Sequence, residues 1–454
     1  GSKLRSGLTR GLGYRLFGVA LAAALAASLA GCAGSTFETL ERKVKNPFSK
    51  KEVPLPGERV AVITDTTEIV ADPGEGAKPV QVPAPQANAA WSQPGGSPSN
   101  SLGNLALNGD VRKVWSSDAG TGSSSSGRLS AVPLVADGKV FTLDAAGTVS
   151  AFSAASGGRI WSQDVTPENE KSKEGFGGGL ALDGGRLYAA TGYGTVVALD
   201  PGNGAVVWTK RVGEPVRGAP TASGGKIFFV SAGNTLYALG ASDGEQLWTS
   251  RGLPVSATLL SNVSPAVTGA VVIAPFPAGD VGAFEVASGK QTWRDSLARQ
   301  ADTSASGVLG DPARPVVDRG VVFVVSHGGK MIAIAESSGE RLWTRNIAGT
   351  QMPWVAGDTV YVVDLSGKLI ALARADGKVR WVSQLPGGSR WSGPVLAGSK
   401  LWLVSGEGLL VGADARTGQL LSQLDLDTPV FVAPVVAGGR MYILADNASL
   451  IALN

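Results

Sequence analysis

The chain has one cysteine and one histidine among its 454 residues, and this scarcity excludes several kinds of chemistry. A single cysteine cannot form a disulfide within the chain, and a zinc site needs several nitrogen or sulfur ligands. A Ser-His-Asp arrangement would have to include His327, which lies in the turn-like stretch "SHGGK" without a nucleophile-elbow signature beside it. We therefore predict no catalytic residues, no metal site and no cofactor, and we predict that the protein is not an enzyme.

The cysteine, Cys32, ends an N-terminal segment with the order typical of a secretory signal. Basic residues without any acidic residue precede an apolar run from Leu16 to Leu29. That run is shorter than the roughly 20 residues that a helix needs to cross a bilayer. It ends in Leu29-Ala30-Gly31-Cys32, which resembles the lipobox of bacterial lipoproteins. The resemblance implies that Cys32 carries lipid and that Ala33 after it directs the chain to the outer membrane; an ordinary signal peptide with an incidental cysteine is the alternative.

Composition divides the chain into three predicted parts. Residues 1–32 are the lipoprotein signal peptide with its lipobox, residues 33–90 a mostly disordered tether, and residues 91–454 a β-propeller. The tether prediction rests on few aromatics and on Pro- and Ala-rich stretches such as "VPAPQANAA". Removal of the signal peptide takes four positive charges from a formal net charge of +3, so the mature chain is close to neutral. This charge does not favour nucleic acid as a partner.

The rest of the chain is a repeat with fixed internal spacing. A reference proline recurs at Pro133, Pro220, Pro265, Pro315, Pro353, Pro394 and Pro434, with Leu180 standing in once. A small residue follows each at Ala151, Ala198, Ala238, Ala283, Ala333, Ala371, Gly412 and Ala452, and a tryptophan follows at Trp161, Trp208, Trp248, Trp293, Trp343 and Trp381. Each unit consists of short β-type runs separated by Gly-containing turn pairs, which predicts hairpins.

Units of this length with four strands each are typical of propeller blades, so the fold class predicted is all-β: an eight-bladed β-propeller of four-stranded blades. The large indole is expected to pack where the small residue leaves room and to hold neighbouring blades together. The eighth unit stops at Asn454, before its tryptophan, and "DVRKVWSSD" supplies Trp115 at the other end of the chain. We therefore predict that this N-terminal strand completes the last blade and closes the ring, which removes exposed sheet edges.

The stretches "ALDPGNGAVVW" (198–208) and "AFSAASGGRIW" (151–161) resemble the repeats of pyrroloquinoline-quinone propeller enzymes. Those enzymes typically carry adjacent cysteines over the quinone and a calcium site with carboxylate ligands. This chain has neither the second cysteine nor a carboxylate cluster with calcium-loop spacing. A membrane-anchored quinoprotein dehydrogenase or sensor therefore stays an alternative, as does a cell-wall-associated adhesion module.

Lipobox, spacer and eight repeats together resemble the BamB family, lipoprotein subunits of the outer-membrane β-barrel assembly (Bam) machinery. The stretches "GTQMPWVAGDTVYVV" (349–363) and "VRWVSQLP" (379–386) resemble the form found in alphaproteobacteria. The resemblance implies a non-enzymatic scaffold, lipid-anchored in the outer membrane and facing the periplasm. Its implied partners are the periplasmic domains of BamA and the Bam complex, with unfolded outer-membrane proteins as a further candidate, and its implied role is to support folding of barrel proteins.

The candidate partner-binding residues lie on two long links between repeats. Loops longer than a connection requires are frequent sites of binding. The resemblance places the BamA contacts on the links Trp248–Pro265 and Trp293–Pro315, where Leu259 and Asp311 match family contacts. Leu260 stands where the family has a basic residue. We add Arg251 and Arg299 as candidates that supply charge to the same surface.

Overall fold

All regular structure in the described part of the chain is β-strand. The computed structural model describes residues 68–108, 110–125, 127–171, 174–253, 263–297, 313–387 and 390–454. Residues 68–454 form one unit, and residues 1–67, with Cys32 and the start of the predicted tether, lie outside the described residues. Within the described residues, no helix has the length and apolar character needed to cross a membrane.

The strands form eight four-stranded antiparallel sheets, and each sheet is one blade whose strands follow one another from the centre outward. The first four blades have these strands: β2 (Leu134–Ala136), β3 (Lys139–Leu143), β4 (Thr148–Ser153) and β5 (Arg159–Asp164) in blade 1; β6 (Gly178–Asp183), β7 (Arg186–Thr191), β8 (Thr195–Leu199) and β9 (Val206–Arg211) in blade 2; β10 (Thr221–Ser223), β11 (Lys226–Val230), β12 (Thr235–Gly240) and β13 (Gln246–Arg251) in blade 3; β14 (Ala266–Val267), β15 (Val271–Phe276), β16 (Asp280–Glu285) and β17 (Gln291–Ser296) in blade 4.

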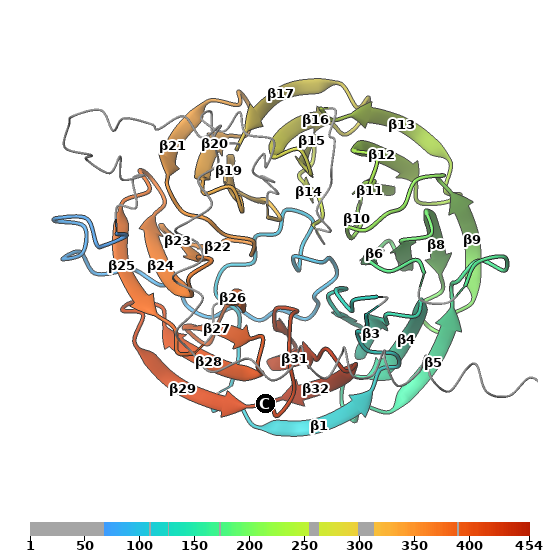
Figure 1. Ribbon diagram of the computed structural model, residues 1–454, viewed down its shortest axis with the longest axis horizontal. Coiled ribbons are helices and arrows are strands. Elements are labelled where there is room, and N and C mark those ends of the chain that lie inside the picture. Colours follow the sequence, from blue (N-terminus) through green and yellow to red (C-terminus); the bar gives the residue numbers. More distant parts are fainter. Residues whose placement is uncertain are drawn as a thin grey trace, which may run out of the picture. The chain divides into compact units, whose positions relative to one another are not determined.

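The second half of the ring repeats the same order, and Figure 1 shows the eight sheets arranged around a common centre. The strands are β18 (Val316–Asp318), β19 (Val321–Val325), β20 (Met331–Ala335) and β21 (Arg341–Arg345) in blade 5; β22 (Trp354–Ala356), β23 (Thr359–Val363), β24 (Lys368–Ala373) and β25 (Val379–Gln384) in blade 6; β26 (Trp391–Ala397), β27 (Lys400–Ser405), β28 (Leu409–Asp414) and β29 (Leu420–Asp425) in blade 7; β30 (Val435–Ala437), β31 (Arg440–Leu444), β32 (Ser449–Leu453) and β1 (Lys113–Asp118) in blade 8. The predicted fold, an all-β propeller of eight four-stranded blades, is confirmed.

Both ends of the repeat region meet in blade 8, as the sequence predicts. Strand β1 pairs antiparallel with β32, and Trp115 lies opposite Ala452. In Figure 1, β1 lies on the outer circumference beside the C-terminus. The N-terminal strand therefore completes the last sheet and closes the ring, which leaves β32 without a free edge.

The recurring small residue and tryptophan are direct cross-strand neighbours in every blade that has both. Ala198 lies opposite Trp208, and the same pairing recurs in blades 1, 3, 4, 5, 6 and 8. The indole Nε1 also reaches the next blade: that of Trp161 donates to the Pro201 carbonyl at 3.1 Å. In the turn that receives it, Gly204 has φ +77°, and a Cβ there would lie 2.5 Å from Trp161 Cε3. The predicted packing between blades is confirmed.

In blade 7, the space beside the recurring small residue is filled by a tryptophan from a different strand. Ser422 replaces the tryptophan and lies opposite Gly412. The space is filled from the neighbouring strand, because a Cβ on Gly412 would lie 2.9 Å from a ring carbon of Trp402. Trp402 is buried, and its Nε1 donates to Ala397 of its own blade at 3.0 Å. Blade 7 therefore keeps an indole in its core but does not use it as a hydrogen-bond bridge to blade 8.

A segment without regular structure, residues 86–105, runs around the inside of the ring and is called the strap below. Figure 1 shows it in light blue, inside the innermost strands. It makes hydrogen bonds to all eight blades, in blade order: Trp91 with Val135, Ser92 with Leu182, Gln93 with Ala222, Pro98 with Val267, Ser99 with Val317, Gly103 with Trp354, Leu105 with Leu396, and Asn88 with Val436. The innermost strands are two to seven residues long, and the strap provides partners for backbone groups on their inner edges.

Residues 68–82, which precede the strap, contact the outer strand of blade 6. The Asp72 backbone N–H donates to the Val379 carbonyl at 2.9 Å, and the Asp72 carboxylate accepts from the Val379 N–H at 2.6 Å. Glu75, almost fully buried, lies 3.5 Å from Arg380 Nε. Of the segment 33–90 that we predict to be a tether, residues 68–90 thus make defined contacts with the propeller. Their Pro- and Ala-rich composition does not reveal this, because the contacts are with residues about 300 positions away.

Candidate functional site

The two faces of the ring differ in the connections they carry. Because neighbouring strands are antiparallel, the links between blades and the turns between second and third strands lie on one face, which we call the link face. The turns between first and second strands, and between third and fourth strands, lie on the other face, the turn face. Both candidate partner links belong to the link face, since each joins the outer strand of one blade to the inner strand of the next.

Most of the predicted partner-binding residues lie outside the described residues. The structure does not describe residues 254–262 or 298–312, so Leu259, Leu260, Arg299 and Asp311 are not placed. Arg251 is described: it is the last residue of β13 and is exposed on the link face. Leu253, two residues further on, is a large apolar side chain that is 48 % exposed. The first link therefore leaves its blade with a cationic and an apolar side chain in solvent.

The described residues that flank the two links are joined to one another. At the blade 3 side, Arg294 Nη2 at the end of blade 4 donates to the Arg251 carbonyl at 3.2 Å. At the far side, Arg314 Nε donates to Ser264 Oγ at 2.6 Å, so residues just after each link are hydrogen-bonded together. Burial lowers the pKa of Arg314 to about 10. The bases of the two links, meaning the described residues that flank them, are thus hydrogen-bonded to one another across blades 3, 4 and 5.

A buried ion pair lies between these link bases. Asp280, at the start of β16, is 1 % exposed, and its carboxylate lies 3.3 Å from Arg294 Nε. The same guanidinium lies over the Phe276 ring, 5.3 Å from its centroid. Burial raises the pKa of Asp280, and the positive charge of Arg294 opposes that rise. Arg294 therefore connects the core of blade 4 to the end of blade 3, directly between the two link bases.

Our sequence reasoning missed this pair, although the repeat contains a signal for it. Blades 1, 2 and 3 have threonine at the position of Asp280, namely Thr148, Thr195 and Thr235. Blade 4 replaces that threonine with an acid and places a base eleven residues after its recurring alanine. When one repeat has an acid and a base at positions on paired strands where the other repeats have neither, the two side chains are expected to be in contact.

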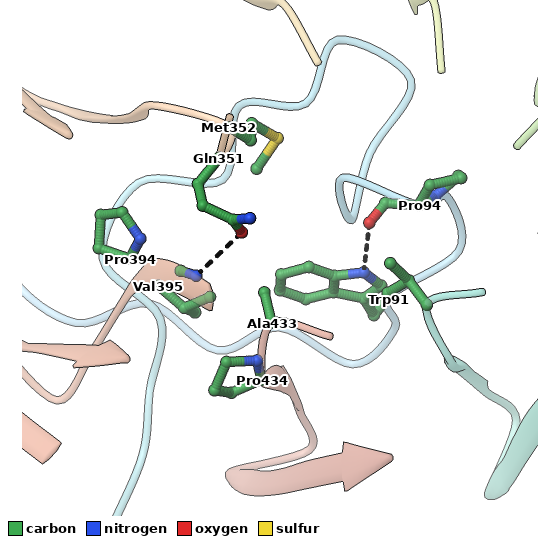
Figure 2. A pocket seen from close by; sticks show the side chains of 10 residues that line it. Trp91, Pro94, Gln351, Met352, Pro394, Val395, Ala433 and Pro434 are labelled. Carbon is green, nitrogen blue, oxygen red and sulfur yellow. Dashed lines mark hydrogen bonds between the residues drawn. The ribbon is translucent and has the colours of Figure 1, made fainter. Parts of the chain in front are cut away.

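Near the centre of the ring, Trp91 of the strap packs against residues of blades 6, 7 and 8. Figure 2 shows Trp91 projecting toward Gln351 and Pro434, which lie in links between blades, and toward Pro394 of β26. Trp91 is 2 % exposed, and its ring stacks on Trp354 with a centroid distance of 6.1 Å. The cavity left between these residues is about 30 Å³, room for a few water molecules at most. Trp91 of the strap therefore fills most of the space between these residues.

On the link face lies a larger cavity of about 440 Å³, which we call the cup. It is lined by Thr350, Arg390 and Phe431 from three successive links and by His327 and Asp364 from turns of blades 5 and 6. Gln351 lines both the cup and the small cavity beside Trp91, so Trp91 of the strap lies close to the cup. The histidine that the sequence suggested was a surface turn residue is exposed and lies at this opening.

The described residues do not provide the calcium site that accompanies a quinone cofactor in propeller enzymes. Among the described residues, no group of three His, Cys, Asp or Glu side chains is placed to hold a metal. The carboxylate in the cup, Asp364, accepts hydrogen bonds from the N–H groups of Ser366 and Lys368 within its own turn. The alternative of a quinoprotein finds no support in this side-chain arrangement.

A protein-family model described as outer membrane protein assembly factor BamB matches residues 35–170, 145–383 and 383–454 of the chain. The chain belongs to the BamB family. The BamB of Salmonella typhimurium is 30 % identical over 346 residues, which are 75 % of this chain and 88 % of that protein. The BamB of Escherichia coli K12 is 30 % identical over 324 residues, 70 % of this chain and 82 % of that protein.

Comparison with solved structures shows the same propeller fold in other proteins. The crystal structure of BamB from Moraxella catarrhalis matches with a TM-score of 0.66 at 16 % identity, over 76 % of this chain and all of that one. Quinohemoprotein alcohol dehydrogenase from Comamonas testosteroni matches with a TM-score of 0.65 at 14 % identity, over 80 % of each chain. At these identities the likeness shows the fold alone, and a propeller fold does not specify a function. Family membership, with relatives named as assembly factors, is what separates this BamB-family chain from the dehydrogenases.

Proposed function

We propose that this BamB-family protein is a non-enzymatic scaffold that binds the periplasmic domains of BamA through the links 254–262 and 298–312 and so supports folding and insertion of barrel proteins. The observation that carries the proposal is the joining of the two link bases. Arg314 with Ser264, and Arg294 with Arg251, hold the ends of both links together on the link face. A surface built from two long neighbouring loops on a rigid scaffold is suited to binding a protein.

The chemistry of the two links supports a protein partner. They contain the adjacent pair Leu259 and Leu260, the cation Arg299 and the acid Asp311, and Arg251 lies at the start of the first link. Apolar anchors surrounded by polar and charged residues are typical of interface centres, where a few residues carry most of the binding energy. The same surface would serve other subunits of the Bam complex or unfolded outer-membrane proteins if BamA did not occupy it.

Capture of purified BamA periplasmic domains on the immobilised protein tests the proposal. The double variant Leu259→Ala with Asp311→Arg should abolish capture, because truncation of an interface anchor commonly costs about 2 kcal/mol or more and the second change reverses a charge. Its Tm should equal that of the wild type. Glu407→Arg serves as the control, because Glu407 is an exposed residue of a link-face turn in blade 7, far along the chain from both links. Wild-type capture by the double variant would exclude this surface.

We further propose that Cys32 carries the lipid that anchors the protein in the outer membrane, facing the periplasm. The order of charge, apolar run, small residues and thiol in residues 1–32 supports the anchor, and the family to which the chain belongs supports the membrane. Cys32→Ala should release the protein into the soluble periplasmic fraction or leave it unprocessed. Failure of labelled palmitate to enter the wild-type protein would refute the anchor.

A further inference from the structure

Several polar side chains that line the cup have no hydrogen-bond partner among the described residues. Within the described residues, the side chains of His327, Thr350, Arg390 and Ser392 line it without a hydrogen bond or ion pair to another residue. Gln351 uses its Oε1 to accept from the Gly393 N–H at 3.3 Å, which leaves its NH₂ group to donate. The carboxylate that lines the cup, Asp364, accepts at Oδ1 from the N–H groups of Ser366 and Lys368, and at both oxygens from the Ser366 hydroxyl, within its own turn. The groups left without a partner are therefore a guanidinium and an amide NH₂ group, which only donate, and an imidazole and two hydroxyl groups, which can also donate.

Aromatic side chains form part of the wall beside these donors. Trp391 and Phe431 both line the cup. The guanidinium of Arg128 lies over the Phe431 ring, 5.8 Å from its centroid. Gln351 lines both the cup and the small cavity beside Trp91 of the strap, so the two cavities are neighbours. A cavity of about 440 Å³ is within the size range of small-ligand sites.

From this arrangement we infer that the cup is a binding site for a carboxylate carried next to an apolar group. The carboxylate would accept hydrogen bonds from Arg390, His327 and the hydroxyl groups, and the apolar group would lie against Trp391 and Phe431. A guanidinium matches a carboxylate because it donates two parallel hydrogen bonds to the two oxygens. Such a ligand is either the C-terminal residue of a polypeptide or a small organic acid. The inference is independent of the proposed BamA links, which lie on blades 3 to 5.

Calorimetric titration of residues 33–454 with three probes tests the inference and distinguishes the two sources. The probes are acetyl-Ala-Ala-Phe with a free carboxylate, the same peptide as its C-terminal amide, and phenylacetate. We expect at least one of the two acids to bind with a Kd of about 1 mM or tighter, and the amide to bind at least about tenfold more weakly than the free peptide. Tighter binding of the peptide identifies a chain terminus as the ligand; equal binding of phenylacetate identifies a small acid.

Two variants locate the binding. Arg390→Gln should weaken binding of the acid at least about tenfold and leave the weak binding of the amide unchanged, because the lost interaction is with the charge. Arg416→Gln is the matched control: Arg416 is an exposed arginine of the same blade, but it lies in the turn between β28 and β29 on the turn face. The inference is overturned if neither acid binds, if acid and amide bind equally, or if both variants bind the acid like the wild type.

Discussion

The turn face and the link face of the ring use their side chains in opposite ways. The strap, which lies against the inner strands near the turn face, buries Trp91, Gln93 and Asn104 and satisfies their polar atoms. The link face leaves Arg390, His327 and Thr350 without partners among the described residues. Burial with full hydrogen bonding stabilises a structure, whereas exposed unpaired groups are free to bind another molecule.

Gln93 shows how strongly the strap is held. Its Nε2 donates to the carbonyls of Leu182 in blade 2 and Ala222 in blade 3, both at 2.9 Å, and its Oε1 accepts from the Ala222 N–H at 2.9 Å. One amide therefore joins two blades from the inside. The comparison of the two faces shows that the strap joins the blades at the centre of the ring. Because the long links are not needed for this, they can differ in length and sequence.

The largest effect should follow from removing residues 68–118, which contain the strap and β1. The deletion exposes the edge of β32 and the inner edges of the other blades, so we expect a protein that does not fold or whose Tm falls by roughly 10 °C or more. Circular dichroism melting of residues 119–454 against residues 33–454 measures it. The control deletes residues 33–67, which we expect to change Tm by no more than about 1 °C. Equal melting of all three proteins would show that the strap and β1 do not stabilise the ring.

Trp91→Ala tests the centre of the strap by a single change. Loss of a fully buried indole stacked on Trp354 should cost about 3–5 kcal/mol in the free energy of unfolding. Leu253→Ala on the link face is the control, since Leu253 is 48 % exposed and its truncation should cost less than about 0.5 kcal/mol. Urea denaturation measures both. Similar costs for the two variants would contradict the difference between the faces.

Arg294→Leu tests the support beneath the link bases and should show a characteristic pH dependence. It leaves Asp280 buried without its cation, at a cost of about 3 kcal/mol near pH 7. Burial raises the folded-state pKa of Asp280, and such a group favours folding below that pKa and loses this contribution as pH rises through it. Without Arg294 the pKa rises further. The deficit relative to wild type should therefore be smaller at about pH 4.5 than at about pH 7.5. A deficit that does not change with pH would show that lost packing on Phe276 causes it.

The smallest effect should come from the cup. Arg390→Gln and Thr350→Ala each remove a side chain that has no partner among the described residues, so the free energy of unfolding should change by less than about 0.5 kcal/mol. Urea denaturation measures the change, and Gln93→Ala, which leaves buried backbone groups in two blades without partners, provides the contrast at about 2 kcal/mol. A cost for Arg390→Gln as large as that for Gln93→Ala would mean that the cup is a structural element.

The sequence was sufficient for the blades because their information is local and repeated. Alanine and tryptophan at constant spacing predicted the cross-strand pairs, and the missing eighth tryptophan together with Trp115 predicted the closure between β32 and β1. The substitution of Trp402 for the absent tryptophan of blade 7 was not predictable in the same way, because the indole reaches the space from a different strand.

By itself, the sequence determined the number of blades, their strand order and the way the ring closes, because each follows from the spacing of the recurring residues along the whole chain. The strap, the joined link bases and the cup were decided by the tertiary structure. The strap sequence "WSQPGGSPSNSLGN" has the composition of a linker, and its partners lie up to about 350 residues away. The strap takes one defined course for a physical reason that no local sequence pattern shows. Only a closed ring presents eight inner strand edges to one segment, and only there do the polar groups of that segment find hydrogen-bond partners away from water.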